Sequence, residues 1–456
     1  MPTAEFANLV NGQVEQTATG RWGIASIKPP GDYTLVMTTA RHRYMEPTRG
    51  INELVVPGMM YWMETHRVRG NVAAGLVHPA PKTTHDWWGV EGRVLGVESD
   101  TMPDPRSVSE TAGALKIVSG CSYDPGSAAF RFHSAVNEHT KHAMAFVRWG
   151  DTNPHCSLRQ YDAQADAYAV RDAVMTADAI HNHVAYYLLN NTGLQPRADQ
   201  LIVRHYHGSV QGGRTNLEPI FDKSKQALVF GARLQLCEEG RQFDLPMRWS
   251  PIPMPVARYR QLRDRVRQAH GWEPLEGEAT AARPLRVSHT PTNTRLKGSD
   301  AFRAAVLRLQ QRGVPIEMDL IQNVSLREAL ERQALTDCCF DSFWLGMQGS
   351  GLQMAAMEQP VVAGDAENRE IYQRRIGSVP YTFADDEQTL SKQLERLAMD
   401  AVYRAKEAAR VATYCERYHD YRAVAVRYEC DLAEVLGRKD VLTDAKRARA
   451  LPPLKD

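Results

Sequence analysis

The stretch that decides the fold opens with LRVSHTPTNTRLKGSDAF (residues 285–302) and closes with GMQGSGLQMAAMEQPVVAG (346–364). Short apolar runs alternate here with a basic turn, a glycine-rich turn and amphipathic segments, a pattern that predicts strands alternating with helices. Such alternation is typical of a parallel sheet. The basic turn and the glycines at a helix start both suit a ligand that carries phosphate groups.

Turn and cap residues define the elements of this part of the chain. Ser299 is expected to cap the helix after the first strand, and Ser325 with Glu328 to form a capping box for the next helix. The Cys338–Cys339 pair lies in an apolar run and is expected to be core rather than chemistry. Strands are expected at 285–290, 317–322, 337–346 and 360–365.

The preceding part of the chain shows the same alternation. Strand-like apolar runs separated by helical patterns occur at 115–120, 143–149, 201–209 and 227–234. Two successive α/β domains are expected to face a cleft at the carboxyl ends of their strands. The predicted organisation is a β-rich accessory domain with a linker (1–113), a first α/β domain (114–282), a second α/β domain with C-terminal helices (283–437) and a tail (438–456).

The composition is that of a globular protein, with 43% hydrophobic residues, 24% charged residues and a formal net charge of +1. This charge gives no overall field that favours nucleic acid or a membrane surface. The seven cysteines show no metal or CxxC spacing, so a reducing cytoplasm is expected. The first residues do not have the pattern of a signal peptide, and no apolar run approaches the roughly 20 residues that span a bilayer.

Two turns of the second α/β domain carry candidate binding residues. Arg295 and Lys297 precede a predicted helix start, and cations at a helix N-terminus neutralise a phosphate or a diphosphate leaving group. The second turn places Gly349, Ser350 and Gly351 at another helix start, where backbone N–H groups can bind an anion. A solvated basic turn and close helix–sheet packing are the structural alternatives for these two patterns.

A related turn follows the first strand of the first α/β domain. The sequence YDPGS (123–127) places Gly126 and Ser127 before a predicted helix. This is again a strand, a glycine turn and a helix start, so it is expected to face the same cleft from the other side.

Four histidines form two His-x-His pairs near the carboxyl ends of predicted strands: His181 with His183, and His205 with His207. Residues i and i+2 of a strand point to the same face. A histidine there can take a proton from an acceptor hydroxyl near neutral pH, or it can be a satisfied polar strand end. His-x-His also suggests a metal, but no third ligand with a defined spacing is visible, so no metal site is assigned.

Two further features bear on nucleic-acid binding. The Trp87–Trp88 pair of the β-rich segment is either core or an exposed stacking surface. The segment ARYRQLRDRVRQAH (257–270) contains five arginines, which is typical of a solvated helix face or of a nucleic-acid patch.

The order and spacing of these elements resemble the GT-B-fold glycosyltransferases, in particular the family-4 retaining group. The resemblance covers 285–437, through HTPTNTRLKGSDAF, EMDLIQNVSLREALERQALTD and LGMQGSGLQMAAMEQPVVAGD, and more loosely 115–255. It implies an α/β fold with two Rossmann-like domains facing a cleft. The small N-terminal β-rich domain is an addition that the resemblance does not explain.

The resemblance assigns roles to individual residues. In that family the basic turn holds the diphosphate of a nucleotide sugar, which implies this role for Arg295 and Lys297. A histidine of the family matches His183, which implies a catalytic role for His183 in acceptor-side proton handling or sugar positioning. His207 is also assigned to the acceptor side. Donor-binding roles are implied for Gly126, Ser127, Gly349, Ser350, Gly351 and Gln353; the last stands where the family has a ribose-binding Glu.

The implied reaction is transfer of a sugar from a UDP- or GDP-sugar to an acceptor hydroxyl, with retention. The diphosphate leaves the anomeric carbon, stabilised by Arg295, Lys297 and helix N-terminal amides, and the hydroxyl attacks on the same face. No cofactor or metal is implied besides the nucleotide sugar, and the acceptor is a glycan, a small molecule or modified DNA.

Three alternatives remain open at this level. A phage-type DNA glycosyltransferase acting on hydroxymethylated bases would use the tryptophans and the arginine-rich helix to contact DNA. A non-catalytic sugar-nucleotide-binding protein is suggested by the uncharged Gln353. An epimerase with a similar fold is the third, but the carboxylate sets on which such enzymes rely are not seen.

Overall fold

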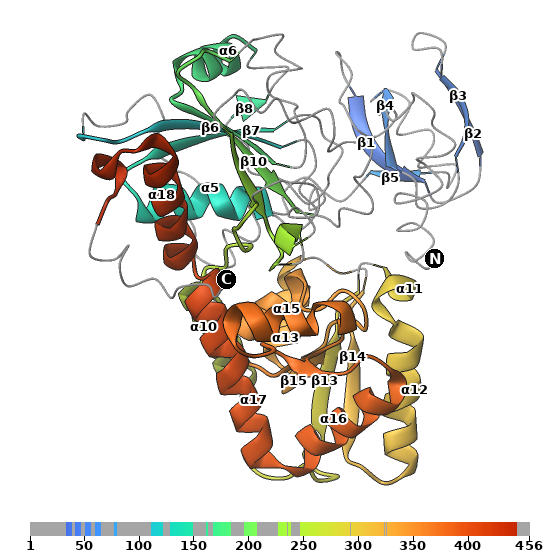
Figure 1. The fold of residues 1–456 in the computed structure, drawn as a ribbon. Helices are drawn as coiled ribbons and strands as arrows, with labels where there is room; N and C mark the ends of the chain where they lie inside the picture. The colour runs from blue at the N-terminus through green and yellow to red at the C-terminus, as the bar shows by residue number, and fades with distance from the viewer. Residues whose placement is uncertain are drawn as a thin grey trace. The chain divides into compact units, whose positions relative to one another are not determined.

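The fold was obtained as a computed structural model (Figure 1). It describes residues 33–38, 42–46, 51–55, 60–64, 77–79, 111–121, 128–148, 161–162, 167–183, 196–207, 227–234, 236–238, 247–291, 293–322, 324 and 326–444.

The chain divides into two compact units, of which the first comprises residues 1–88 and 150–157. Its described strands pair antiparallel, β1 with β4 and β5, and β2 with β3. The Trp87–Trp88 pair lies outside the described residues. The strands are β1 (Tyr33–Thr38), β2 (His42–Glu46), β3 (Ile51–Val55), β4 (Met60–Glu64) and β5 (Val77–Pro79).

Both α/β domains belong to the second unit, and the first of them contains a seven-stranded parallel sheet. In chain order its strands lie 3-2-1-4-5-6-7 across the sheet, which is the Rossmann order with one added strand. The strands are β6 (Lys116–Cys121), β7 (Ala143–Arg148), β8 (Tyr161–Asp162), β9 (Ala179–His183), β10 (Leu201–Tyr206), β11 (Ala227–Gly231) and β12 (Arg248–Trp249).

Helices cover both faces of this first sheet. One face packs on α5 (Ala128–His139) and α18 (Tyr421–Leu436), with Phe132, Val203 and Tyr428 in the shared core. The other face packs on α6 (Ala167–Thr176). Because helices cover both faces and side chains alternate between the faces, strands such as β7 and β11 read as nearly continuous apolar runs.

The second α/β domain has a five-stranded parallel sheet in the chain order 2-1-3-4-5, the flavodoxin-like order. The prediction of two Rossmann-like α/β domains is therefore confirmed. Its strands are β13 (Leu285–His289), β14 (Ile316–Leu320), β15 (Cys338–Phe340), β16 (Val361–Ala363) and β17 (Thr382–Phe383). Its helices are α11 (Thr294–Lys297), α12 (Ser299–Gln311), α13 (Leu326–Ala334), α14 (Gly349–Ala356), α15 (Ala366–Ile376), α16 (Glu387–Met399) and α17 (Ala401–Tyr414).

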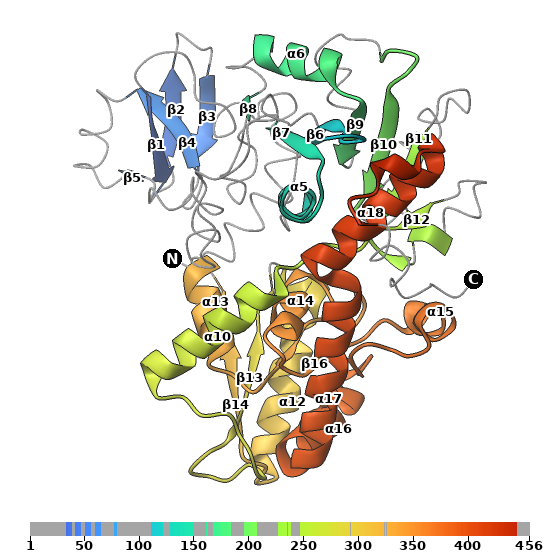
Figure 2. The ribbon, with the colours of Figure 1, turned by 90° about the vertical axis from the view of Figure 1, so that its left-hand side faces the viewer.

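The chain passes between the two α/β domains twice. Helix α10 (Val256–His270) leads from the first domain to the second. A π-helical turn, Cys415–His419, ends α17, and α18 then returns to pack on α5 of the first domain, as Figures 1 and 2 show. The helix that the sequence groups with the second domain therefore contributes Tyr428 and Leu432 to the core of the first.

Several local predictions can be checked against these elements. Cys338 and Cys339 are buried, which confirms their assignment to the core. Ser299 was predicted to be a helix cap and is not: Gly298 occupies the N-cap of α12, and the buried Ser299 hydroxyl instead donates to Nε2 of His289 at 2.8 Å. Ser325 lies outside the described residues, so its capping box stays a prediction. Within the described residues, no helix combines the length and the apolar character needed to cross a bilayer.

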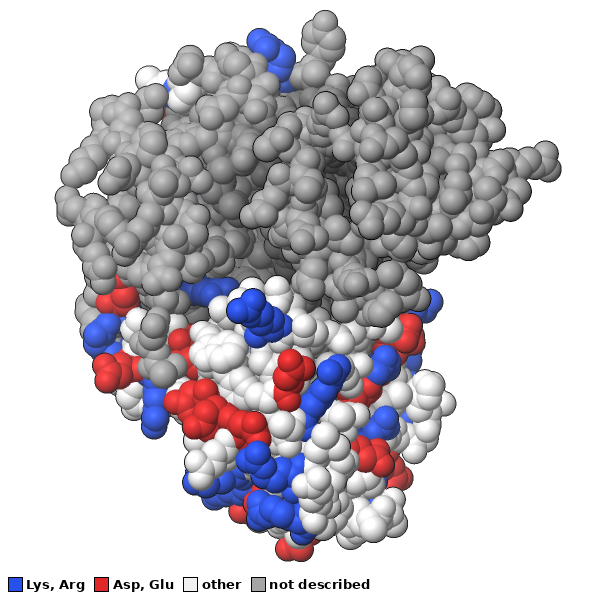
Figure 3. Space-filling model, turned by 90° about the vertical axis from the view of Figure 1, so that its right-hand side faces the viewer, with Lys and Arg blue, Asp and Glu red and all other residues white. Residues whose placement is uncertain are grey.

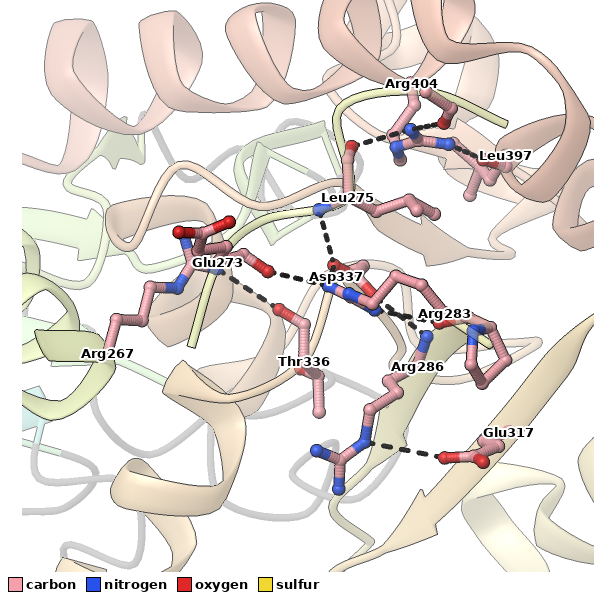
Figure 4. Close-up of polar contacts among 12 residues, drawn as sticks. Arg267, Glu273, Leu275, Arg283, Arg286, Glu317, Thr336, Asp337, Leu397 and Arg404 are labelled. Atoms are coloured by element: carbon pink, nitrogen blue, oxygen red, sulfur yellow. Dashed lines mark hydrogen bonds and ion pairs between the residues drawn. The ribbon is translucent and has the colours of Figure 1, made fainter. Parts of the chain in front are cut away.

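The linker between the two α/β domains, residues 271–283, is held in place by one buried carboxylate (Figure 4). Asp337, just before β15, accepts hydrogen bonds from the Arg283 guanidinium at 2.8 and 3.0 Å and from the backbone N–H groups of Leu275 and Arg286. Arg404 of α17 donates to the carbonyl oxygens of Leu275 and Gly277 in the same linker. The linker is thus bound to the second domain along much of its length.

We expect Asp337→Ala to lower the free energy of unfolding by about 2–4 kcal/mol, because two backbone N–H groups and a guanidinium lose their acceptor together. Glu317→Ala is the matched control, since Glu317 is exposed and its ion pair with Arg286 is long, at 3.8 Å. This substitution should change the free energy of unfolding by less than about 0.5 kcal/mol. Urea unfolding of both variants measures the difference. Equal effects of the two substitutions would contradict the anchoring role of Asp337.

Candidate functional site

The candidate site lies at the carboxyl ends of β13 and β15. These two strands flank the point where the strand order of the second sheet reverses, and ligands of open α/β sheets bind outside such a switch point. The segment after β13 carries α11, and the segment after β15 leads into α14. The two turns singled out in the sequence therefore do lie at adjacent strand ends.

Asp341 is the centre of this site. Its carboxylate, 2% exposed as a residue, accepts from Lys297 Nζ at 2.6 Å and from the Ser350 hydroxyl at 2.8 Å. It also accepts a hydrogen bond from the backbone N–H of Gln348, the N-cap residue of α14. An ammonium group, a hydroxyl and a helix N-terminus thus converge on one negatively charged group.

The charge state of Asp341 follows from these contacts. Burial alone raises the pKa of a carboxyl, but the Lys297 ammonium and the hydrogen bonds from Gln348 and Ser350 hold the pKa of Asp341 below its ordinary value. The carboxylate is therefore ionised at neutral pH. A position at which an ammonium group, a hydroxyl and a backbone N–H converge on one anion is chemically suited to a phosphate group as well.

Glycine at position 351 permits this close arrangement. A Cβ atom at Gly351 would lie 2.6 Å from Asp341 Oδ2 and 2.7 Å from the Met347 side chain. At Gly349, by contrast, a Cβ atom would meet nothing within 4 Å. The two glycines of the same turn thus differ in function: Gly351 makes room for the anion at the start of α14, and Gly349 leaves open space beside it.

The structure separates the two cations of the basic turn. Lys297 is 7% exposed and faces Asp341, whereas Arg295 is exposed on α11 and its side chain makes no hydrogen bond or ion pair with another residue that the structure describes. Asn293 caps α11 by accepting from the Leu296 N–H at 3.0 Å, which fixes the turn that directs Lys297 inward. Gln353 lies partly exposed on α14.

Side chains of the first α/β domain reach this region. Arg233, after β11, donates to the side-chain carbonyl of Gln348 at 2.5 Å. Glu238, from the same segment, forms an ion pair with Arg374 of α15 at 2.9 Å. Segments that follow the carboxyl end of a strand in each sheet therefore meet near the N-terminus of α14. Sequence patterns did not identify Asp341, Arg233 or Glu238 as part of the site. The signal available for Asp341 was the polar Asp341–Ser342 pair inside an apolar run.

The four histidines also come together, at the carboxyl ends of β9 and β10. His183 Nδ1 and His207 Nε2 are 2.7 Å apart, and His181 stacks on His183 with ring centroids 4.4 Å apart. Burial, followed by the neighbouring imidazoles, lowers the pKa of His183 well below its ordinary value. Burial lowers the pKa of His181 to about 3 and, together with Arg233, that of His207 to about 4. All three imidazoles are therefore neutral at pH 7.

These histidines differ in exposure. His183 is fully buried, whereas His207 at the end of β10 is only half-buried. His207 is thus the member of the pair that lies nearer the surface. Gly126 and Ser127, which the sequence also places at a strand end, lie outside the described residues.

The arginine-rich helix is occupied by contacts within the protein. In α10, Arg258, Arg260 and Arg263 form ion pairs with Glu138 or Glu358, at 3.0, 2.9 and 2.7 Å. Arg267 donates to the carbonyl oxygens of Ala334 and Thr336. Figure 3 shows basic and acidic side chains interspersed on the described part of one face. These arginines bind other elements of the fold and do not form a free basic stripe for DNA.

No family model and no curated protein matches the chain. The solved structures with a similar fold include Anabaena Alr3699/HepE in complex with UDP-glucose (13% identity, 71% of this chain and 99% of that chain, TM-score 0.48). Sucrose-phosphate synthase from Thermosynechococcus elongatus is 10% identical (70% and 99% covered, TM-score 0.47). The catalytic domain of starch synthase IV from Arabidopsis thaliana, bound to ADP and acarbose, is 11% identical (71% and 100% covered, TM-score 0.45). At these identities the likeness is one of fold alone.

Proposed function

We propose that the protein is a glycosyltransferase that uses a nucleotide-diphosphate sugar, with the diphosphate bound between Lys297 and the N-terminus of α14. The observation that carries the proposal is the convergence of the Lys297 ammonium, the Ser350 hydroxyl and the Gln348 N–H on one anionic position at a switch point. In the free protein the Asp341 carboxylate takes that position. A bound diphosphate competes with it for the same donors.

The remaining contacts to the nucleotide sugar are proposed to come from exposed groups around this position. Arg295, which is exposed on α11, closes over the outer phosphate oxygens. Gln353 accepts a hydrogen bond from the ribose, and Gly349 gives the sugar room beside the helix start. Gly126 and Ser127 are proposed to contact the donor from the first α/β domain. Within this proposal, a UDP- or GDP-sugar is the co-substrate.

The proposed step breaks the bond between the anomeric carbon and the diphosphate oxygen, and the electron pair leaves with the nucleoside diphosphate. The acceptor hydroxyl oxygen forms the new bond on the same face, so the configuration is retained. Lys297, Arg295 and the α14 amides stabilise the charge that develops on the leaving group. The acceptor proton passes to a phosphate oxygen of the departing nucleoside diphosphate, and His207, hydrogen-bonded to His183 at 2.7 Å, positions the acceptor.

The compartment proposed for this activity is the cytoplasm. Cys237, Cys338, Cys339, Cys415 and Cys430 are free thiols, which suits a reducing environment.

The direct test is donor turnover. The protein is incubated with a panel of UDP-, GDP- and ADP-sugars and candidate acceptors, and released nucleoside diphosphate is quantified by chromatography. The proposal predicts release from at least one donor, enhanced by an acceptor. Saturable binding of a nucleotide sugar with no release would instead support a non-catalytic binding protein, the alternative that the uncharged Gln353 favours.

Arg295→Ala should raise the KM for the donor about tenfold and leave the melting temperature unchanged, because an exposed cation that contacts one phosphate contributes roughly 1–2 kcal/mol to binding. Arg303→Ala is the matched control, since Arg303 is an exposed arginine of the neighbouring helix, paired loosely with Asp300 at 3.7 Å. Steady-state kinetics distinguish the two. An unchanged KM in Arg295→Ala would remove Arg295 from the donor site.

A further inference from the structure

Three of the four clustered histidines, His181, His183 and His205, are placed by strand register. In the parallel pairing of β9 with β10, His183 is opposite His205, and His181 precedes His183 on the same face of the sheet. His181, His183 and His205 are each at most 2% exposed. Three imidazoles from two neighbouring strands thus share one buried position, a relation that the spacing within either His-x-His pair does not reveal.

The ring nitrogens of these three residues lie close together. One candidate ligand nitrogen from each of His181, His183 and His205 lies within 4.8 Å of the others. A tetrahedral zinc ion binds imidazole nitrogens at about 2.0–2.1 Å, which requires them to be about 3.3 Å apart. The three rings are stacked, with interplanar angles of 13°, 17° and 28°, so binding of one ion requires the imidazoles to rotate until their nitrogens face a common point.

The hydrogen bonds of the cluster leave ring nitrogens with unused lone pairs. His205 Nε2 lies 3.0 Å from the Ser250 carbonyl oxygen, which can only accept, so Nε2 carries the proton and Nδ1 keeps its lone pair. His183 Nδ1 contacts His207 Nε2 at 2.7 Å; when His183 donates in this bond, its Nε2 is free to bind an ion. A ligand histidine whose other nitrogen donates to a neighbouring acceptor is the usual arrangement around a protein-bound metal.

Packing alone does not explain why three imidazoles are buried together. The buried atoms His181 Nδ1 and Nε2, His183 Nε2 and His205 Nδ1 have no hydrogen-bond partner among the residues that the structure describes. A buried polar atom without a partner costs about 1–3 kcal/mol, and here several are concentrated at one point. Phe132 and Tyr428 pack around His181, at 4.9 and 5.4 Å between ring centroids, and shield this point from water.

We propose that His181, His183 and His205 bind a divalent transition-metal ion of the zinc class, with a water molecule as the fourth ligand and His207 as the hydrogen-bond partner of His183. Neutral imidazoles suit zinc, cobalt, nickel or copper, whereas calcium and magnesium prefer oxygen ligands. The half-buried His207 marks the side from which the ion enters. The bound ion fixes the carboxyl ends of β9 and β10. This site is separate from the sugar-donor position at Lys297. It shares His183 and His207 with the proposed acceptor side, but binding of the ion does not require transfer.

The test uses the full-length protein after removal of metals with a chelator. Added Zn²⁺ should bind at one ion per chain and raise the melting temperature, and Co²⁺ should give the visible absorption of a tetrahedral site. His181→Gln and His205→Gln should each weaken Zn²⁺ binding by about 100-fold. His142→Gln and His270→Gln, one buried in the same domain and one exposed on α10, should bind like the wild type.

A measurement on the wild type keeps the proposal testable even if a cluster variant fails to fold. The X-ray absorption spectrum of the zinc-loaded protein should show three imidazole nitrogens at about 2.0–2.1 Å. No stoichiometric Zn²⁺ binding, a spectrum with oxygen ligands in place of imidazoles, or equal loss of binding in His270→Gln would each overturn the proposal. These readouts do not involve donor turnover, so failure of the metal site and failure of the proposed activity are distinguishable.

Discussion

Lys297→Ala should lower kcat/KM for the nucleotide-sugar donor by about 10²–10³-fold, the usual loss when one preorganised donor to a developing anion is removed. Lys297 is the only described lysine of the site, and its ammonium lies at the position where the diphosphate is proposed to bind. The neighbouring Arg295 is exposed and does not reach the buried position. Steady-state kinetics of both proteins, with the nucleotide sugar that the wild type uses, measure the effect.

The same substitution should also reduce stability at neutral pH, because Asp341 becomes a buried carboxylate without its cation; such a loss amounts to about 3–5 kcal/mol. In the wild type the pKa of Asp341 is lowered, so its ionised form stabilises the fold above about pH 4, and this contribution is lost as the pH falls through the lowered pKa. The difference in unfolding free energy between Lys297→Ala and wild type should therefore be larger at pH 7 than at pH 3.

Asp341→Asn separates these two effects. It keeps Lys297 and removes the negative charge that competes with the diphosphate, so the affinity for nucleoside diphosphate should increase, whereas in Lys297→Ala it should decrease. Calorimetric titration of both variants gives the two affinities. Donor turnover near the wild-type level in Lys297→Ala would remove Lys297 from the site.

Gly351→Ala should weaken donor binding at least tenfold and lower the melting temperature. Helix propensity alone favours alanine over glycine by about 1 kcal/mol, so the sign of the effect depends on contacts. The added Cβ would lie 2.6 Å from Asp341 Oδ2, and Asp341 is held by three hydrogen bonds that prevent an easy shift. Binding titrations and thermal unfolding measure both consequences.

Gly349→Ala is the control for the effect of that substitution on stability, because Gly349 itself is proposed to lie beside the bound sugar. It lies two residues earlier in the same helix, and a Cβ atom there meets nothing within 4 Å of the protein. Its stability should equal or exceed that of the wild type. If Gly351→Ala also retained full stability and donor binding, the close packing of Asp341 on α14 would not be important for the site.

The sequence was sufficient for the parallel α/β domains and for Lys297 and the glycine turn, because apolar periodicity and turn residues are local signals. It was not sufficient for Asp341. The run 337–346 was predicted to be one strand, yet β15 ends at Phe340, and the polar Asp341 and Ser342 begin the loop that leads to α14. Polar residues with turn preference inside an apolar run were the available evidence.

Long-range relations were the second limit. The spacing of each His-x-His pair predicts a shared face, but only the adjacency of β9 and β10 unites the two pairs. Likewise, the apolar face of α18 does not indicate which domain it covers, and it covers the first rather than the second. Register and helix docking depend on contacts between distant parts of the chain, which local pattern does not encode.

The most direct measurement is a crystal structure of the protein with a bound nucleoside diphosphate, chosen as the one that raises its melting temperature most. The account predicts a phosphate within hydrogen-bond distance of Lys297 Nζ, the Ser350 hydroxyl and the backbone N–H at the start of α14, with the Asp341 carboxylate displaced from Lys297. A nucleotide bound elsewhere, with the Lys297–Asp341 pair intact at 2.6 Å, would contradict it.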